Sequence, residues 1–183
     1  SEKLTAGRDA ALTAENISQD ASSQINAARD ITAKASNTLT TQGQVTAGQN
    51  LTVSSNTLTQ NGKLLARNSA QLNASMLNNS GSVQGASLSV GSATLSNSGS
   101  LLSGGNLTIN TQDFTQSGST GAKGKADITA SGQLTSTGSL VSDDALTLSA
   151  AQINNSGTLS GAKELSASAG TFTTSATSVT HSD

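Results

Sequence analysis

The chain repeats nearly the same phrase at short, regular intervals. Residues 77–90, 95–109 and 153–167 read LNNSGSVQGASLSV, LSNSGSLLSGGNLTI and INNSGTLSGAKELSA. A unit of about nineteen residues cannot bury a core of its own, so successive units are expected to stack on one another. The repeat therefore favours an elongated solenoid over a single round domain.

The composition favours a stacked structure over a disordered chain. Only 33% of the residues are apolar, and Phe114 and Phe172 are the two aromatic residues. Disordered chains usually combine low hydrophobicity with high net charge or much proline, whereas this chain has a formal net charge of −2, 11% charged residues and no proline. The absence of cysteine excludes a disulfide scaffold or a thiolate metal site. No apolar run approaches the length of a membrane span, so we expect a soluble piece of a longer chain.

Three columns of apolar residues run through the repeat. The first, with spacings between 18 and 22 residues, is Ile17, Leu39, Leu58, Leu77, Leu95, Phe114, Leu134, Ile153 and Phe172. The second is Leu12, Ile31, Leu51, Leu72, Leu88, Leu107, Ile128, Leu146 and Leu165. The third is Leu4, Ile25, Val45, Leu64, Val83, Leu101, Leu140 and Leu159, and it skips one unit, where residues 119–127 offer Thr120 and Ala122.

Apolar and polar residues alternate within a unit, as in Leu51-Thr52-Val53. This period of two predicts short strands, and the frequent Gly and Asn argue against a helix. Each strand is expected to pair in parallel with its counterpart in the next unit. The predicted fold is all-β: a right-handed parallel β-helix (β-solenoid) of about nine coils, with roughly 19 residues per coil.

Polar residues also recur at fixed places in the unit. We predict that NSG forms a corner, in which Gly and Asn adopt positive φ and Ser binds its own backbone. An outward threonine column is predicted at Thr13, Thr32, Thr52, Thr108, Thr129 and Thr147. A column of acids and amides is predicted just before the same strand, at Asp9, Asp30, Asn50, Asn68, Asn106, Asp127 and Asp144.

The unit, with its NLT strand and its NNSG or SNSG corner, resembles the filamentous haemagglutinin repeat of two-partner-secreted exoproteins. The resemblance covers essentially the whole chain and implies a β-helical stalk on the surface of a Gram-negative bacterium. The family includes adhesins and contact-dependent growth inhibition effectors. We expect residues 1–183 to be a single β-helical segment of a longer chain, with longer, less regular coils over 1–43 and regular repeats over 44–183. The first two coils depart from the family pattern because they lack the NSG corner.

The candidate sites have a structural explanation in each case. Asp143 and Asp144 are the adjacent carboxylates that a polysaccharide-active β-helix would need, but Asp144 belongs to the turn column. His181 stands near the chain end without an acid partner. Residues 118–126 miss the phosphate-loop pattern in spacing and at Ala126, and are interpreted as an exposed, flexible corner. Gly104-Gly105 is followed by Asn106 rather than the Asp of a calcium repeat. The glycosylation triplets at Asn16, Asn50, Asn73, Asn78, Asn106 and Asn154 follow from composition alone.

The sequence thus predicts no catalytic, cofactor-binding or metal-binding residue and no enzyme activity. A sugar site lacks an aromatic platform, and a nucleic-acid site lacks a basic stripe, since the isoelectric point is near 5.2. The predicted function is a structural stalk or presentation segment of a secreted, cell-surface adhesin or toxin-delivery exoprotein. The alternative is that one face binds a receptor on a host or target cell; an ice-binding solenoid and a polysaccharide-active enzyme are more remote. The expected partner is an outer-membrane transporter during export, without nucleic acid or a small-molecule substrate, and the rod is expected to be monomeric.

Overall fold

The computed structural model describes residues 2–175 and 179–182, and all its regular elements in these ranges are β-strands. Short strands form one series: β1 (Lys3–Ala6), β3 (Gln24–Ala27), β5 (Gln44–Ala47), β7 (Lys63–Ala66), β9 (Ser82–Gly85), β11 (Ser100–Ser103), β14 (Ser119–Ala122), β16 (Ser139–Ser142), β18 (Thr158–Gly161) and β20 (Val179–Ser182). The other series is β2 (Ala10–Gln19), β4 (Ile31–Thr41), β6 (Leu51–Gln60), β8 (Ser69–Asn79), β10 (Ser87–Asn97), β12 (Leu107–Thr111), β13 (Asp113–Gln116), β15 (Ala126–Ser136), β17 (Ala145–Asn155) and β19 (Glu164–Thr174).

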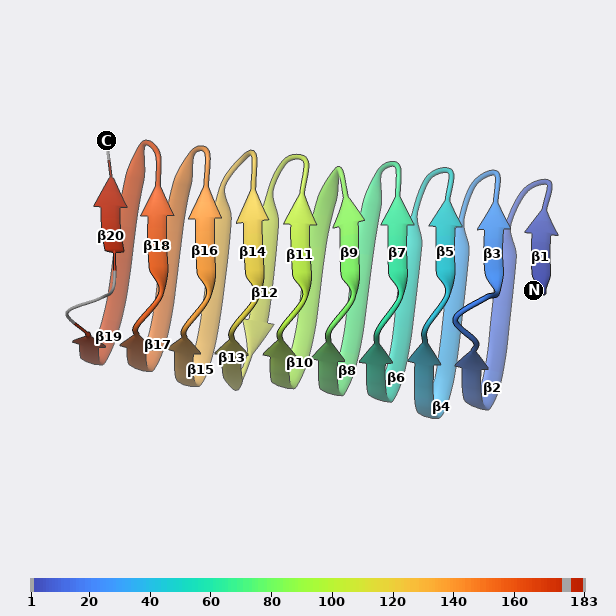
Figure 1. The fold of residues 1–183 in the computed structure, drawn as a ribbon, viewed down its shortest axis with the longest axis horizontal. Coiled ribbons are helices and arrows are strands. Elements are labelled where there is room, and N and C mark those ends of the chain that lie inside the picture. Colours follow the sequence, from blue (N-terminus) through green and yellow to red (C-terminus); the bar gives the residue numbers. More distant parts are fainter. Residues whose placement is uncertain (1, 176–178, 183) are drawn as a thin grey trace.

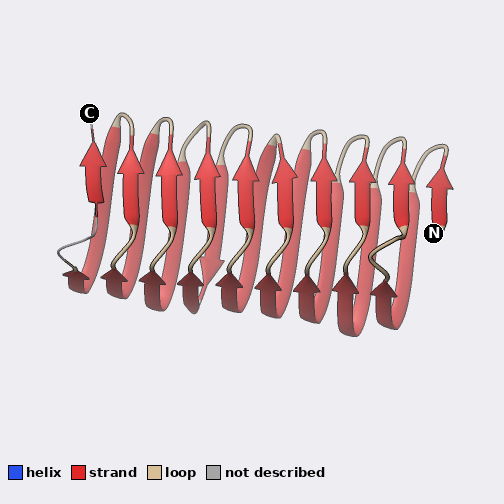
Figure 2. Ribbon diagram, in the orientation of Figure 1, coloured by secondary structure: helices blue, strands red, loops and turns tan. Residues whose placement is uncertain are grey.

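The two series form two parallel sheets that run the whole length of a rod. In each sheet a strand pairs with its counterpart one coil earlier and one coil later. In Figure 1 the short strands run upward in front, the chain returns behind them, and each following coil is displaced toward the C-terminal end, which makes the coil right-handed. Figure 2 shows the same strands as two continuous layers joined by short loops. The predicted β-solenoid of about nine coils with about 19 residues each is confirmed.

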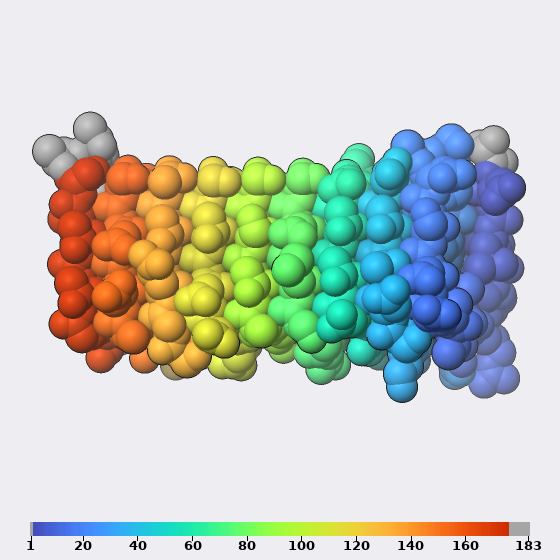
Figure 3. All heavy atoms as spheres, turned by 90° about the horizontal axis from the view of Figure 1, so that it is seen from below, coloured from blue at the N-terminus to red at the C-terminus, as the bar shows by residue number. Residues whose placement is uncertain are grey.

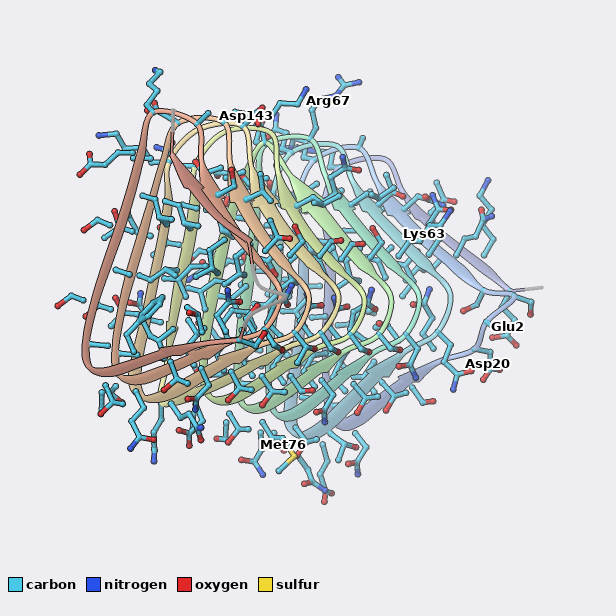
Figure 4. The ribbon with its side chains drawn as sticks, turned by 60° about the vertical axis from the view of Figure 1, so that its left-hand side comes forward. Glu2, Asp20, Lys63, Arg67, Met76 and Asp143 are labelled. Atoms are coloured by element: carbon cyan, nitrogen blue, oxygen red, sulfur yellow. The ribbon has the colours of Figure 1, made fainter. Side chains whose placement is uncertain are left out.

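The long strands bend, so that each coil has three sides. In β6 the buried residues Leu51 and Val53 fall on odd positions, whereas the buried residues Leu58 and Gln60 fall on even positions. Because side chains alternate between the faces of a strand, this change of parity marks a corner around Asn56. In the oblique view of Figure 4 the coils are triangular in outline. At the corresponding place in a later coil the strand is interrupted, which separates β12 from β13.

The first and third apolar columns are confirmed by the strand register. Leu58 pairs with Leu77, and Leu77 with Leu95. In the third column Thr120 fills the skipped unit, paired between Leu101 and Leu140, and its side chain is buried. A buried threonine therefore takes the place of a leucine in this coil.

The second predicted column was wrong at three positions. The register pairs Leu51 with Ala70 and Leu107 with Ala126, while Leu72 pairs with Val53. Two inward columns stand side by side here: Ala10, Ile31, Leu51, Ala70, Leu88, Leu107, Ala126, Leu146 and Leu165 form one, and Leu12, Ala33, Val53, Leu72, Val90, Ile109, Ile128, Leu148 and Ala167 form the other. In the three coils where it was wrong, the prediction chose the larger of the two inward residues. Because side chains alternate between the two faces of a strand, a residue two positions away lies on the same face. The prediction that these side chains point inward was therefore still correct.

The unequal coil lengths are absorbed at the corners. The turn between Gln19 and Gln24 is longer than the corresponding turns from Thr41 to Gln44 up to Asn155 to Thr158, and the backbone N–H of Ser23 donates to the carbonyl of Asp20 at 3.0 Å. The register also shifts between Lys34 and Thr38, where β4 carries an extra residue. The strands on either side of these insertions remain in register.

A narrow apolar core runs along the rod axis. Leu77, Leu95, Leu134 and Leu159 are each fully buried. Figure 3 shows the coils as successive coloured bands across one face of the molecule. At the last coil Phe172 is 42% exposed, although it continues the first column, because no described coil covers it.

Candidate functional site

Glycines stack on one another at the NSG corner. A Cβ added to Gly62 would lie 2.0 Å from the carbonyl oxygen of Gly43, and one added to Gly81 would lie 2.2 Å from that of Gly62. The contact continues along the rod at Gly99, Gly118, Gly138 and Gly157. No described residue has a positive φ, so the predicted reason for glycine was wrong. Glycine is needed here because the backbone of the preceding coil leaves no room for a side chain.

The residue that ends β2, β4, β6, β8, β10, β13, β15 or β17 points into the rod, and together these residues form a buried polar column. It consists of Gln19, Thr41, Gln60, Asn79, Asn97, Gln116, Ser136 and Asn155. The prediction placed the second Asn of NNSG in the corner with positive φ, whereas the strand ladder holds it inside. This column was missed because amides are usually exposed.

Asn97 is a member of the buried column whose side-chain nitrogen and oxygen both have hydrogen-bond partners. Its Nδ2 donates to Gln116 Oε1 at 2.8 Å, to Ser119 O at 3.1 Å and to Thr120 Oγ1 at 3.1 Å. Its Oδ1 accepts from Asn79 Nδ2 at 2.7 Å. Asn97 therefore ties its own coil to the coils on either side of it, and buried polar groups bonded in this way hold the register.

The corner serines also bond between coils. Ser80 Oγ donates to Asn61 Oδ1 at 2.6 Å, and Ser117 Oγ donates to the carbonyl of Asn97 at 3.4 Å. The predicted bond from serine to its own backbone was therefore wrong at both positions. Glycine, serine and the buried amide together form one edge of the rod, which we name the NSG edge.

The acid and amide column lies at the second edge, between the short and the long strands. Asp30 Oδ1 accepts the backbone N–H of Asn50 at 3.0 Å, and Asn106 Oδ1 accepts that of Lys125 at 3.0 Å. The oxygen of one coil thus caps the strand of the next. Four of the predicted members, Asp9, Asp30, Asn50 and Asn106, share this position.

The other three members were assigned to the wrong position. Asn68 and Asp144 lie one residue before the position that Asn50 holds in its coil. The backbone N–H of Asn68 donates to the carbonyl of Gln49, and the backbone N–H of Lys163 donates to the carbonyl of Asp144. Asp127 pairs with Thr108 on the outward face of the strand. The two-residue error at Ile128 accounts for Asp127, whereas Asn68 and Asp144 each stand one residue before the shared position.

Arg29 and Asp9 form an exposed ion pair across two coils. Arg29 Nη2 lies 2.5 Å from Asp9 Oδ2, and the Asp30 backbone N–H donates to Asp9 Oδ1 at 3.2 Å. The hydrogen bond from Arg29, followed by that from Asp30, lowers the pKa of Asp9. The bond with Asp9 raises the pKa of Arg29.

The threonine column is shorter than predicted. Thr32, Thr52, Thr108 and Thr147 share one outward position, which Ala11, Gln71, Ser89, Asp127 and Ser166 interrupt. Thr13 pairs with Lys34 in the next outward column. A second hydroxyl-rich column, not predicted, lies on the other half of the long strands: Ser18, Thr40, Thr59, Asn78, Ser96, Thr115, Thr135, Asn154 and Thr173. A comparison of the residues next to the first apolar column would have revealed it.

Asp143 and Asp144 lie at the second edge, and neither enters an enclosed cavity. Asp144 Oδ2 lies 3.4 Å from Lys163 Nζ, and its backbone N–H donates to Ser142 Oγ at 3.1 Å. Asp143 is exposed. The two residues thus belong to a turn, and Asp144 forms an ion pair there. Among the described residues no cluster of three or more His, Asp or Glu side chains is placed to hold a metal ion.

Residues 118–126 are more ordered than predicted. Ser119–Ala122 form strand β14, and Gly124 donates to the carbonyl of Gly105 at 2.8 Å. The predicted corner is confined to residues 123–125. Gly104-Gly105 forms the matching corner one coil earlier, where Asn106 Oδ1 occupies the space that a Cβ on Gly124 would need.

An open groove of about 490 Å³ lies at the NSG edge of the first coils. Its lining includes Gly43 and Gly62, and Gln24, Gln44 and Lys63 also border it. None of its lining residues is acidic, so it does not contain a carboxylate pair. The side chain of His181 lies outside the part of the chain that the structure describes. Within that part there is no helix long and apolar enough to cross a membrane.

Comparison with known proteins supports the resemblance over part of the chain. Residues 121–183 match the family model described as haemagglutinin repeat. A stretch of 34 residues is 76% identical to the tRNA nuclease CdiA of Escherichia coli (strain NC101), covering 19% of this chain and 1% of that relative's length. No solved structure matches the chain significantly. The described chain is a β-solenoid, and its residues 121–183 are similar to haemagglutinin repeats.

Proposed function

We propose that residues 1–183 are a stalk segment of a large secreted exoprotein displayed on the surface of a Gram-negative bacterium. The observation that carries the proposal is the continuity of the ladder: the strands of each coil pair with those of its neighbours, and corner glycines and buried amides add contacts between many of the coils. Such a structure holds its two ends at a fixed distance, and its fold depends only on contacts between neighbouring coils. The matches to haemagglutinin repeats and to CdiA support an adhesin or a toxin-delivery protein as the parent.

The proposed export follows from the same architecture. Coils can add one after another as the chain leaves an outer-membrane transporter, because each new coil finds a complete template in the previous one. In this proposal the segment is not an enzyme and holds no cofactor. The division at residue 43 into less regular and regular coils stays a prediction.

An exchange of surfaces tests the proposal in the parent protein. Outward residues of the long strands are replaced, while the inward columns, the corner glycines and the buried amides are kept, so that rod length and stability are preserved. A stalk should then retain secretion and the distal activity. Loss of target-cell adhesion with normal secretion would instead establish the receptor-binding alternative.

The threonine-rich columns allow a second check. An ice-binding solenoid needs regular hydroxyls on a flat face, and the second column offers Thr or Ser in seven of its nine positions. Thermal hysteresis of purified residues 1–183 is expected to be absent. Its presence, lost after Thr40 and Thr59 are changed to Lys, would replace the stalk proposal.

A further inference from the structure

Three large apolar side chains stand in one outward column of the short-strand sheet. Among the described side chains of the short strands, Leu65, Leu102 and Val141 are the large apolar ones that point outward. Leu102 is 36% exposed. They share a column in which Gln84 and Gly121 alternate with them, because the register runs Leu65, Gln84, Leu102, Gly121, Val141.

Two shallow hollows follow this column. One, of about 500 Å³, is lined by residues that include Leu65, Arg67 and Gln84. The other, of about 240 Å³, is lined by residues that include Gln84, Leu102, Gly121 and Val141. A second outward column lies two residues earlier along the same strands. It begins with Lys63 in β7 and continues with serines: Ser82, Ser100, Ser119 and Ser139. The face is therefore partly apolar and has two hollows. The short serine side chains next to the apolar column leave room for another sheet to approach.

The column is complementary to itself in reverse order. A rotation of 180° about an axis along β11, placed between two facing copies, keeps each position along the strand and reverses the order of the coils. Leu102 then faces Leu102 of the other copy, and Leu65 faces Val141. The long side chain of Gln84 faces the hollow at Gly121, where an added Cβ would have no neighbour closer than 3.5 Å.

Two opposite charges at the adjoining edge face each other under the same rotation, while Lys123, which follows β14, faces the uncharged Ala86, which follows β9. Arg67 follows the last position of β7, and Asp143 follows the corresponding position of β16. Their backbone N–H groups bond to Ala47 and Ala122, which hold equivalent places in the coil, so both residues stand at the same height on the edge. Both are exposed (Figure 4), and the structure gives neither an ion-pair partner.

We infer that this face binds a second copy of the chain, with the two rods side by side and running in opposite directions. Arg67 of each copy meets Asp143 of the other, so the pair forms twice, as a two-fold interface requires. The strands β7, β9, β11, β14 and β16 stand side by side in one sheet (Figure 1), so the match extends over five coils. This inference replaces the expectation of a monomeric rod and does not depend on the proposed function.

Cysteine cross-linking tests the two-fold axis, because the chain has no cysteine of its own. Leu102→Cys should form a disulfide-linked dimer under a copper–phenanthroline oxidant, which removes two electrons and two protons from the two thiols. Leu65→Cys alone and Val141→Cys alone should not cross-link efficiently, whereas the double variant should. Ser89→Cys, on a long strand, is the control for random collision. Equal cross-linking of Leu102→Cys and Ser89→Cys would overturn the inference.

Charge exchange tests the pairing without a covalent bond. Sedimentation velocity from about 10 µM to 1 mM is expected to show a monomer–dimer equilibrium. Arg67→Asp and Asp143→Arg should each weaken association about tenfold, and the combined exchange should restore it. Lys34→Asp, on a long strand, should change little. A single rod at every concentration, with circular dichroism unchanged, would show that the face does not self-associate.

Discussion

At the scale of single residues, the rod depends on glycines that leave room for the neighbouring backbone and on asparagines that point inward. Both stand where the sequence pattern suggests a turn. The corner glycines have ordinary negative φ, and their requirement is the carbonyl of the glycine one coil earlier. The asparagine before the corner is buried and bonds along the axis. Both residue types are common in turns, and here the stacking explains them.

Gly81→Ala should destabilise the rod, because its Cβ would lie 2.2 Å from the Gly62 carbonyl oxygen. Backbone on both sides cannot move without breaking the ladder, so we expect a loss of about 3 kcal/mol in the free energy of unfolding. Gly104→Ala is the matched control, since its Cβ would meet nothing closer than 3.6 Å. Urea denaturation measures both. Equal stability of the two variants would mean that the glycine contact is not required.

Asn97→Ala should cost about 2–4 kcal/mol, because it leaves buried partners in both neighbouring coils without their hydrogen bonds. Asn37→Ala is the control: Asn37 Nδ2 donates to Asn16 Oδ1 at 3.1 Å on the exposed surface, and its loss should cost less than about 0.5 kcal/mol. Thermal unfolding followed by circular dichroism compares the two. A small effect at Asn97 would show that solvent reaches the buried column.

The ion pair between Asp9 and Arg29 should make the first coils sensitive to acid. The pKa of Asp9 is lower in the folded state than in the unfolded state, so its contribution to stability is present above about pH 4 and is lost as the pH falls through the folded pKa. Wild type should therefore exceed Asp9→Asn in stability at pH 6 and approach it at pH 3. Melting curves at the two pH values measure this. A difference that stays constant would exclude Asp9 as the titrating group.

At the scale of the strands, period and spacing predicted the fold but not every position within the coil. The first column has one large apolar residue in each coil, so Leu58, Leu77 and Leu95 aligned without ambiguity. The first half of each long strand has two inward positions. In β6 the larger residue, Leu51, comes first and Val53 second, whereas in β8 the smaller residue, Ala70, comes first and Leu72 second. Spacing alone cannot distinguish these arrangements, because both keep the same face inward. Hydrogen bonds between coils decide between them.

The buried amides were not predictable from one sequence for a related reason. Asn79 and Asn97 precede Ser-Gly, and that local sequence is typical of an exposed turn. Their burial depends on acceptors in neighbouring coils, such as the carbonyls of Ser100 and Ser119. The self-complementary outward column likewise needs the register of five strands before it can be seen.

Deletion of Ser36 should be tolerated, whereas deletion of Thr32 should not. Ser36 is exposed in the part of β4 where the register shifts between Lys34 and Thr38, and removing it gives β4 the same spacing as β6. We expect a change of less than about 1 kcal/mol in the free energy of unfolding. Without Thr32 the residues up to the corner would change faces, which would place Lys34 toward the core. Proteolysis rates should separate the two deletions, and similar resistance would contradict the assigned corner.

At the scale of the whole molecule, the rod behaves as a stack in which length and phase are independent properties. Each coil contributes about 4.8 Å to the axis and repeats the same inward positions. Removing a whole unit changes the length alone, whereas removing part of a unit changes the phase of all coils that follow. A stalk is sensitive to phase and tolerant of length, so the two kinds of deletion distinguish a stalk from a binding face.

Deletion of Leu77 through Thr94 should leave a continuous rod in the parent protein. Thr94 pairs with Met76 and Leu95 with Leu77, so the join of Met76 to Leu95 places Leu95 where Leu77 was. The rod should be shorter by only about 4.8 Å, and secretion and distal activity should survive. Deletion of residues 77–85 should instead set inward residues against outward ones at the break and expose apolar surface, so that this variant is degraded or poorly secreted. Secretion and target-cell adhesion are measured on both. Adhesion lost from the in-phase, well-secreted variant would place a receptor-binding surface in the deleted coil, because the ladder itself would be intact.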